Sequence, residues 1–233
     1  FETGAVSYLY YADRIYQINL AIAGIAVGTV SLPALSRTFK EKNIKKLTNI
    51  QSKSFELSLL LSIPASFGLI IASEEIVNAL FGYGSFSKED VKLTADALKY
   101  FGYGVPAFAL VKILSNFFFA RDNTKTPFYI SAGMVVINIT ISLSLFSSIG
   151  FIIIPIATSV STWIGVLVYI YLLNQKKSLL LKKELITNFL KIIISTLIMS
   201  FVLVLSLDNY VSYLNYTYKL KAIYLISIIG FAG

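Results

Sequence analysis

The chain has 233 residues, of which 56% are hydrophobic and only 14% are charged, and its formal net charge is +8. A soluble domain is about 25% charged, so this composition argues against a soluble globular protein, and the high hydrophobicity excludes a disordered one. The absence of cysteine and histidine excludes a disulfide framework and a thiolate metal site, and it removes the commonest general base.

Seven long apolar runs, separated by polar connections, follow one another along the chain. A helix needs about 20 predominantly apolar residues to cross a bilayer. The runs cover residues 5–35, 55–72, 100–120, 127–146, 149–173, 189–207 and those from 222 onward. This pattern predicts an all-α fold, a polytopic transmembrane bundle of about seven helices. Because Phe1 is not an initiator methionine and the last run stops part-way across, we expect an internal piece of a longer protein with an incomplete last helix.

The positive charge alternates between successive connections. The connections 36–54, 121–126 and 174–188, together with Lys191, carry a net charge of +10, whereas the connections between them sum to −2. Lysine and arginine accumulate on the cytoplasmic side of membrane proteins. We therefore place these three connections in the cytoplasm and residue 1 on the outer side. Positive charge spread over alternate loops does not form a nucleic-acid surface, so we expect no nucleic-acid partner.

Asp13 and Arg14 are charged residues deep inside the first apolar run. Arg14 lies nine residues after Ala5, about 14 Å along a helix, where an ionised group costs about 2.5–3.5 kcal/mol. Adjacent helical residues do not face each other, so each charge needs a partner of its own. Two interpretations of Arg14 have equal weight: it binds phosphate in a cavity, or it pairs with a carboxylate on a neighbouring helix. Its helical face also carries Ser7, Tyr10, Tyr11 and Gln17 and continues into Ala21, Gly24 and Gly28, where a GxxxG pattern predicts close helix packing.

Four further polar residues lie in or beside the later runs. Lys112 either extends its long side chain to the inner headgroups or lines an aqueous cavity, and the first interpretation is slightly favoured. Glu56, at the start of the second run, is interpreted as a partner of a helix N-terminus. Asn138 and Thr158 are expected to form hydrogen bonds between helices, and a monovalent-cation site there is the minor alternative.

The tetrapeptide Phe-Gly-Tyr-Gly occurs at 81–84 and again at 101–104, and we interpret both copies as flexible turns. The apolar helices carry no nucleophile–base pair, metal triad or phosphate loop, so the sequence favours binding and movement over bond chemistry. A membrane scaffold is the alternative from another class, but a scaffold has no need of Arg14.

Four segments of the sequence are distinctive. They are Tyr-Tyr-Ala-Asp-Arg-Ile at 10–15, the segment 24–36 with its GxxxG, Leu-Phe-Gly-Tyr-Gly-Ser-Phe at 80–86 and Phe-Ala-Arg-Asp-Asn-Thr-Lys-Thr-Pro at 119–127. These segments, the last most closely, resemble the MurJ/MviN family of lipid II flippases. The resemblance extends to about residue 173, and only hydropathy supports it beyond. It implies helices 8–14 of a fourteen-helix flippase, with five C-terminal-lobe helices in 1–173 and two additional helices in 174–233.

The resemblance implies a transporter, not an enzyme, that moves lipid II from the inner to the outer leaflet of the bacterial inner membrane by alternating access. Its partners would be lipid II, the bilayer and the missing N-terminal half, without a cofactor but with coupling to the membrane potential or a monovalent-cation gradient. Helices from Phe189 onward would hold the polyprenyl tail. The alternative is an exporter of another polyprenyl-linked oligosaccharide or a drug:cation antiporter. The expected substrate-binding residues are Arg14, which matches the family's cavity arginine, with Asp13, Gln17, Lys112, Arg121 and Lys125.

One position departs from the family pattern. Many members have a proline five residues after the cavity arginine, and this chain has Asn19 there. We therefore expect the kink in this helix to be absent or to arise by other means.

Overall fold

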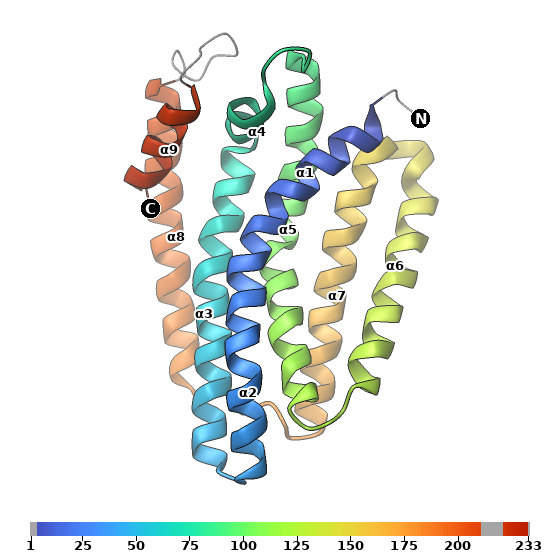
Figure 1. Ribbon diagram of the computed structural model, residues 1–233, viewed down its shortest axis with the longest axis vertical. Coiled ribbons are helices and arrows are strands. Elements are labelled where there is room, and N and C mark those ends of the chain that lie inside the picture. The colour runs from blue at the N-terminus through green and yellow to red at the C-terminus, as the bar shows by residue number, and fades with distance from the viewer. Residues whose placement is uncertain (1–3, 211–220, 233) are drawn as a thin grey trace.

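The structure is a computed structural model that describes residues 4–210 and 221–232, and these residues form helices without any strand (Figure 1). In chain order they are α1 (Ala5–Leu20), a π-helical turn (Ala21–Ala26), α2 (Val27–Lys40), α3 (Ile44–Ile71), α4 (Ser73–Phe81), α5 (Lys88–Phe119), α6 (Lys125–Ile149), a 3-10 turn (Gly150–Ile152), α7 (Ile153–Gln175), α8 (Glu184–Tyr210) and α9 (Lys221–Ala232). The predicted all-α class is confirmed.

The long helices run side by side and alternate in direction, as a multi-pass membrane bundle requires (Figure 1). Within the described residues, five helical segments are long and apolar enough to cross a membrane. One of them, Lys125–Gln175, contains both α6 and α7, while α9 is a shorter apolar helix. All seven apolar runs thus fall on helices, and the additional short helix α4 lies in the connection between the second and third runs.

Two sequence interpretations are wrong because the helices extend beyond the apolar runs. Glu56 does not lie at a helix start, since α3 begins at Ile44, where Asn43 Oδ1 accepts a 3.0 Å hydrogen bond from Lys46 N. The second Phe-Gly-Tyr-Gly copy is not a turn: Phe101 to Gly104 lie inside α5. A side chain at Gly104 would collide with Ser159 Oγ of α7, at 2.6 Å, so this glycine allows close packing.

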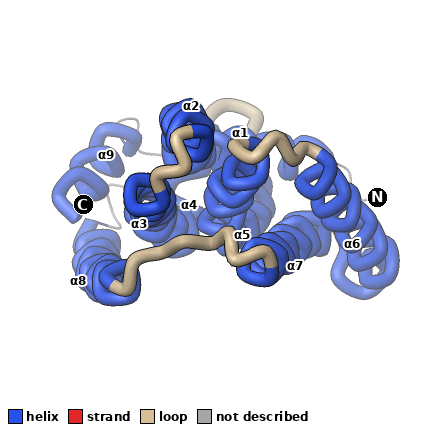
Figure 2. Tube along the Cα trace, turned by 90° about the horizontal axis from the view of Figure 1, so that it is seen from below, coloured by secondary structure: helices blue, strands red, loops and turns tan. Residues whose placement is uncertain are grey.

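Helix α5 is the centre of the bundle, with α1, α3 and α7 packed around it (Figure 2). Pro106 interrupts α5 and cannot donate a hydrogen bond to the carbonyl of Gly102, four residues earlier. Ser66 Oγ of α3 donates to that carbonyl at 2.7 Å instead. The polar group freed by the proline is therefore satisfied by a neighbouring helix, as a membrane interior demands.

Helices α1 and α2 form one continuous element joined by the π-helical turn. Figure 1 shows α1 inclined relative to α2. A π-helical turn is a recognised cause of helix bending, and this helix contains no proline near Asn19. Of the two expected alternatives, an absent kink or one made by other means, the structure shows the second: the bend is present and is made without a proline.

Candidate functional site

Arg14 lies on the exposed side of α1, while Ala12, Ile15 and Tyr16 form its buried side. Tyr16 fixes this orientation by stacking on Phe101 of α5, with ring centroids 4.6 Å apart. The Arg14 guanidinium lies over the Tyr10 ring, 4.8 Å from its centroid. Across residues 4–210 and 221–232 it makes no hydrogen bond and no ion pair, so no described carboxylate neutralises it.

Asp13 and Gln17 bond to each other rather than to Arg14. Gln17 Nε2 donates to Asp13 Oδ2, one helical turn away. The carboxylate therefore has its own partner, as the sequence predicts, and the charge of Arg14 stays available. Asp13, Arg14 and Gln17 thus lie within about one turn of α1.

Lys112 lies against α2, the second half of the same element. Its stem packs on Gly28, since an added Cβ there would lie 3.1 Å from Lys112 Cγ. Asn116, one turn further along α5, donates a 2.7 Å hydrogen bond to the Gly28 carbonyl. The predicted close packing is confirmed, because Gly24 and Gly28 are both buried against α5. The prediction that these glycines continue the face of Arg14 is wrong, because Arg14 is exposed and the π-helical turn between them shifts the face. Gly28 is fourteen residues from Arg14, so Lys112 lies roughly 20 Å from Arg14 along the helix axis.

Arg121 and Lys125 lie further inward, at the two ends of the connection between α5 and α6. This connection is shaped by Asp122, which has a left-handed φ of 55°, and by Asn123, whose Oδ1 accepts from Thr126 N at 3.1 Å. Arg121 donates to main-chain carbonyls and lies over the Phe39 ring, 5.3 Å from its centroid. Burial lowers the pKa of its guanidinium from the ordinary value. Lys125 is exposed at the start of α6.

The predicted cationic side chains thus lie at three positions along the continuous element formed by α1 and α2. Arg14 is on α1, Lys112 is beside Gly28 at the start of α2, and Arg121 is beside Phe39 at the end of α2. They do not form one compact cluster. The structure also supplies a buried polar residue that the sequence reading missed, Asn116; an amide within an apolar run was its signal.

Asn138 and Thr158 join α6 to α7. Asn138 Nδ2 donates to Thr158 Oγ1 at 2.9 Å, and the same hydroxyl donates to the carbonyl of Ile154 at 2.7 Å. The predicted helix-to-helix hydrogen bond is confirmed. Among the described residues no group of three or more acidic side chains could hold a metal ion.

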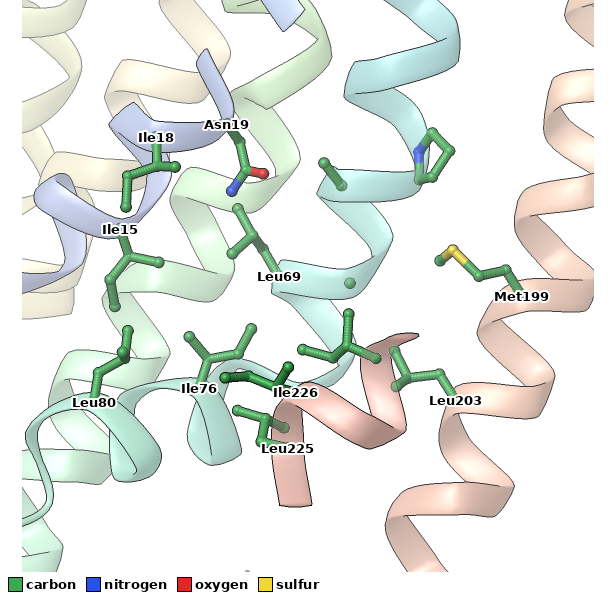
Figure 3. A pocket seen from close by; sticks show the side chains of 14 residues that line it. Ile15, Ile18, Asn19, Leu69, Ile76, Leu80, Met199, Leu203, Leu225 and Ile226 are labelled. Atoms are coloured by element: carbon green, nitrogen blue, oxygen red, sulfur yellow. The ribbon is translucent and has the colours of Figure 1, made fainter. Parts of the chain in front are cut away.

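An apolar pocket of about 440 Å³ lies between α1, α3, α4, α8 and α9 (Figure 3). Ile15, Ile18 and Asn19 of α1 face Met199 and Leu203 of α8 across it, and Leu225 and Ile226 of α9 close one end (Figure 3). Ile18 is one helical turn from Arg14, on the same face of α1. The exposed cation and the apolar pocket are therefore neighbours.

Comparison with known proteins decides the family. The sequence profile described as "Lipid II flippase MurJ" matches residues 1–224. The chain belongs to the MurJ family of lipid II flippases. A solved structure titled "Lipid II flippase MurJ, inward closed conformation" superposes with a TM-score of 0.78 at 29% identity, over 98% of this chain and 45% of that one.

Relatives named "Probable lipid II flippase MurJ" agree. The protein of Rickettsia prowazekii is 37% identical over 236 residues, covering 100% of this chain and 46% of that protein. The protein of Rhizobium meliloti is 38% identical over 207 residues, covering 89% of this chain and 39% of that protein. The chain thus spans about half the length of the curated MurJ relatives it matches. Together with the apolar helices, the match makes this a multi-pass membrane protein of a transporter family.

Proposed function

We propose that the protein containing this chain moves lipid II from the inner to the outer leaflet of the bacterial cytoplasmic membrane. The observation that carries the proposal is Arg14, an exposed arginine at bilayer depth without an ion pair among the described residues. A cation in that place needs water or an anion beside it, since exposure to lipid is costly. An alternating-access cavity that binds the diphosphate of lipid II meets this need.

The chemistry of Arg14 suits a diphosphate. Its planar guanidinium can donate two parallel hydrogen bonds to a phosphate. Asp13 is already held by Gln17 and does not withdraw the guanidinium from an incoming anion. Lys112, exposed beside Gly28, would meet the same anion nearer the inner side. The substrate-binding roles of Asp13, Gln17, Arg121 and Lys125 stay predictions.

The apolar pocket suits the undecaprenyl tail. Ile18 and Asn19 line it, and they lie about one turn from Arg14. A lipid whose diphosphate contacts Arg14 would therefore have its first isoprene units at the pocket entrance. Helix α8, which contains Phe189, and the later helix α9 supply the far wall through Met199 and Leu225.

Membrane placement and energy supply complete the proposal. The loops 36–54, 121–126 and 174–188 would face the cytoplasm and residue 1 the periplasm, and an N-terminal half would face Arg14 across the cavity. The membrane potential or a monovalent-cation gradient would drive the cycle. Asn138 and Thr158 are the candidate cation ligands, and a cation there would have to displace their mutual hydrogen bond.

The test is complementation by the full-length gene in a bacterium depleted of its own lipid II flippase. The wild type should restore growth, Arg14→Ala should not, and Arg14→Lys should restore it weakly, because lysine keeps the charge without the bidentate geometry. Arg37→Ala is the matched control, since Arg37 is an exposed arginine of the same element. Equal rescue by Arg14→Ala, with equal membrane levels, would refute the role of Arg14. Failure of the wild type would favour transport of another polyprenyl-linked oligosaccharide.

A further inference from the structure

Residues 176–183, here called the strap, connect α7 to α8 along the inner end of the bundle. Ser178 holds the strap to the rest of the bundle, because its main-chain carbonyl accepts hydrogen bonds from two side chains that are distant in the sequence. Arg121 Nη2 donates at 2.8 Å, and Gln51 Nε2 of α3 donates at 3.3 Å. These contacts join segments that are 57 and 127 residues apart in the sequence.

Two main-chain amides of the strap bond to α3 as well. Leu180 N donates to Gln51 Oε1 at 2.8 Å, and Lys182 N donates to Ser52 Oγ at 2.9 Å. Both the Nε2 and the Oε1 atom of Gln51 therefore form hydrogen bonds with the strap, and the side chain is fully buried. A buried amide with every bond directed at one segment indicates a specific structural contact rather than a solvated surface residue.

The strap needs these partners because most of it lacks regular secondary structure. The N–H groups of residues 176–179 bond back to carbonyls of α7, whereas the N–H groups of Leu180 and Lys182 bond to side chains of α3, and main-chain groups without a partner are costly when buried. Its other side is apolar: Leu179, Leu180 and Leu181 pack on the main hydrophobic core. The strap is thus held by leucines on one side and by polar bonds on the other.

The contact continues into α8. Asn188 Nδ2 of α8 donates to Glu56 Oε1 of α3 at 3.0 Å. Further along the same helix, Met199 and Leu203 line the apolar pocket, and Leu69 of the neighbouring α3 lines it as well (Figure 3). The strap and the pocket are therefore joined by the same pair of packed helices, α3 and α8.

We propose that Gln51 and Arg121 are positioning residues that fasten the strap to α3 and α5, and thereby hold α8 at the width that the apolar pocket requires. This inference rests on the proposed function for the pocket's role, and it gives Arg121 a purpose other than binding phosphate. Arg121 donates to the carbonyls of Phe117 and Ser178, so its guanidinium joins the end of α5 to the strap.

Two measurements on the purified full-length protein test the positioning without transport. The first is hydrogen exchange of the strap amides: Gln51→Leu and Arg121→Gln should speed it about tenfold, the effect of losing one or two hydrogen bonds. Lys45→Gln, which removes an exposed cation of the same inner surface, should leave it unchanged. Unchanged exchange in both strap variants would overturn the proposal.

The second measurement reports the pocket width. Gly68→Cys and Met199→Cys place thiols on the two walls, in a chain without native cysteine, and a side chain at position 68 meets nothing within 4 Å. Gln51→Leu should lower the yield of a short thiol cross-link between them. An unchanged yield would show that the strap does not position α8.

A third experiment distinguishes a positioning role of Arg121 from direct contact with the substrate. A cross-link between Ser52→Cys and Lys182→Cys restores the strap contact covalently, so it should return lipid II transport to Arg121→Gln in proteoliposomes. If the cross-link forms but transport does not return, Arg121 contacts the substrate instead, and its positioning role is overturned. If the wild type itself does not transport lipid II, the proposed function fails. The hydrogen-exchange and cross-linking measurements still test whether Gln51 and Arg121 position the strap.

Discussion

Replacing Gly24 by alanine should destabilise the bundle more than the same change at Gly28. An added Cβ at Gly24 would lie 3.2 Å from Ala109 Cα, a main-chain atom that cannot move without its helix. At Gly28 the nearest atoms belong to side chains, Lys112 Cγ at 3.1 Å and Asn116 Nδ2 at 3.2 Å. Carbon atoms rest about 3.5–4.0 Å apart, so both positions become overpacked. We expect a cost of about 1–3 kcal/mol at Gly24 and below about 1 kcal/mol at Gly28, where the lysine stem can rotate.

The measurement is the free energy of unfolding of the full-length protein in mixed detergent micelles, by titration with a denaturing detergent. Gly133→Ala is the control, because an added Cβ there meets nothing within 4 Å and alanine favours a helix. Equal losses for Gly24→Ala and Gly28→Ala, or a larger loss for Gly28→Ala, would refute the reasoning from main-chain contact.

Three other outcomes are expected. Lys221 Nζ donates to the Gly82 carbonyl at 2.6 Å, so Lys221→Met should speed hydrogen exchange in α9 about tenfold or more; unchanged exchange contradicts this. Burial raises the pKa of the Glu75 carboxyl, which makes the folded state less stable as pH rises through that pKa. Glu75→Gln should therefore stabilise the protein in thermal melts at pH 7 and not near pH 4, and a pH-independent gain would contradict it. Thr158→Val removes the bond from Asn138 and should cost about 0.6–1.7 kcal/mol in detergent unfolding, whereas a neutral result would assign that bond no weight.

Hydropathy predicted which segments are helices and not where they begin. Residues 44–54 are polar and basic, so the apolar run starts at 55, although the helix starts at Ile44. The residues that cap the helices indicate where the helices begin. Asn43 caps α3, and Ser87 with Asp90 forms a capping box on α5, a spacing that is readable in a sequence.

The candidate site was predictable in part. The position of Arg14, nine residues into the first helix, followed from counting residues, and the packing of Gly24 followed from its spacing to Gly28. The contacts of Arg121 were not predictable, because Ser178 is 57 residues away and its main-chain carbonyl carries no residue-type signal. Motif matching could show that Arg121 belongs to a signature, but only the fold shows what it touches.

The π-helical turn has a geometric consequence for the cavity. In a regular helix fourteen residues bring the chain back to within about 40° of the same face, so Arg14 and Gly28 would point almost the same way. One extra residue in a wide turn rotates everything after it by about 100°. The turn at Ala21–Ala26 therefore lets the inner half turn its glycines toward α5 while Arg14 stays exposed. A proline would bend this helix without changing its angular register; the π-helical turn does both, and deleting one alanine from it would force either Arg14 or Gly28 onto the wrong side.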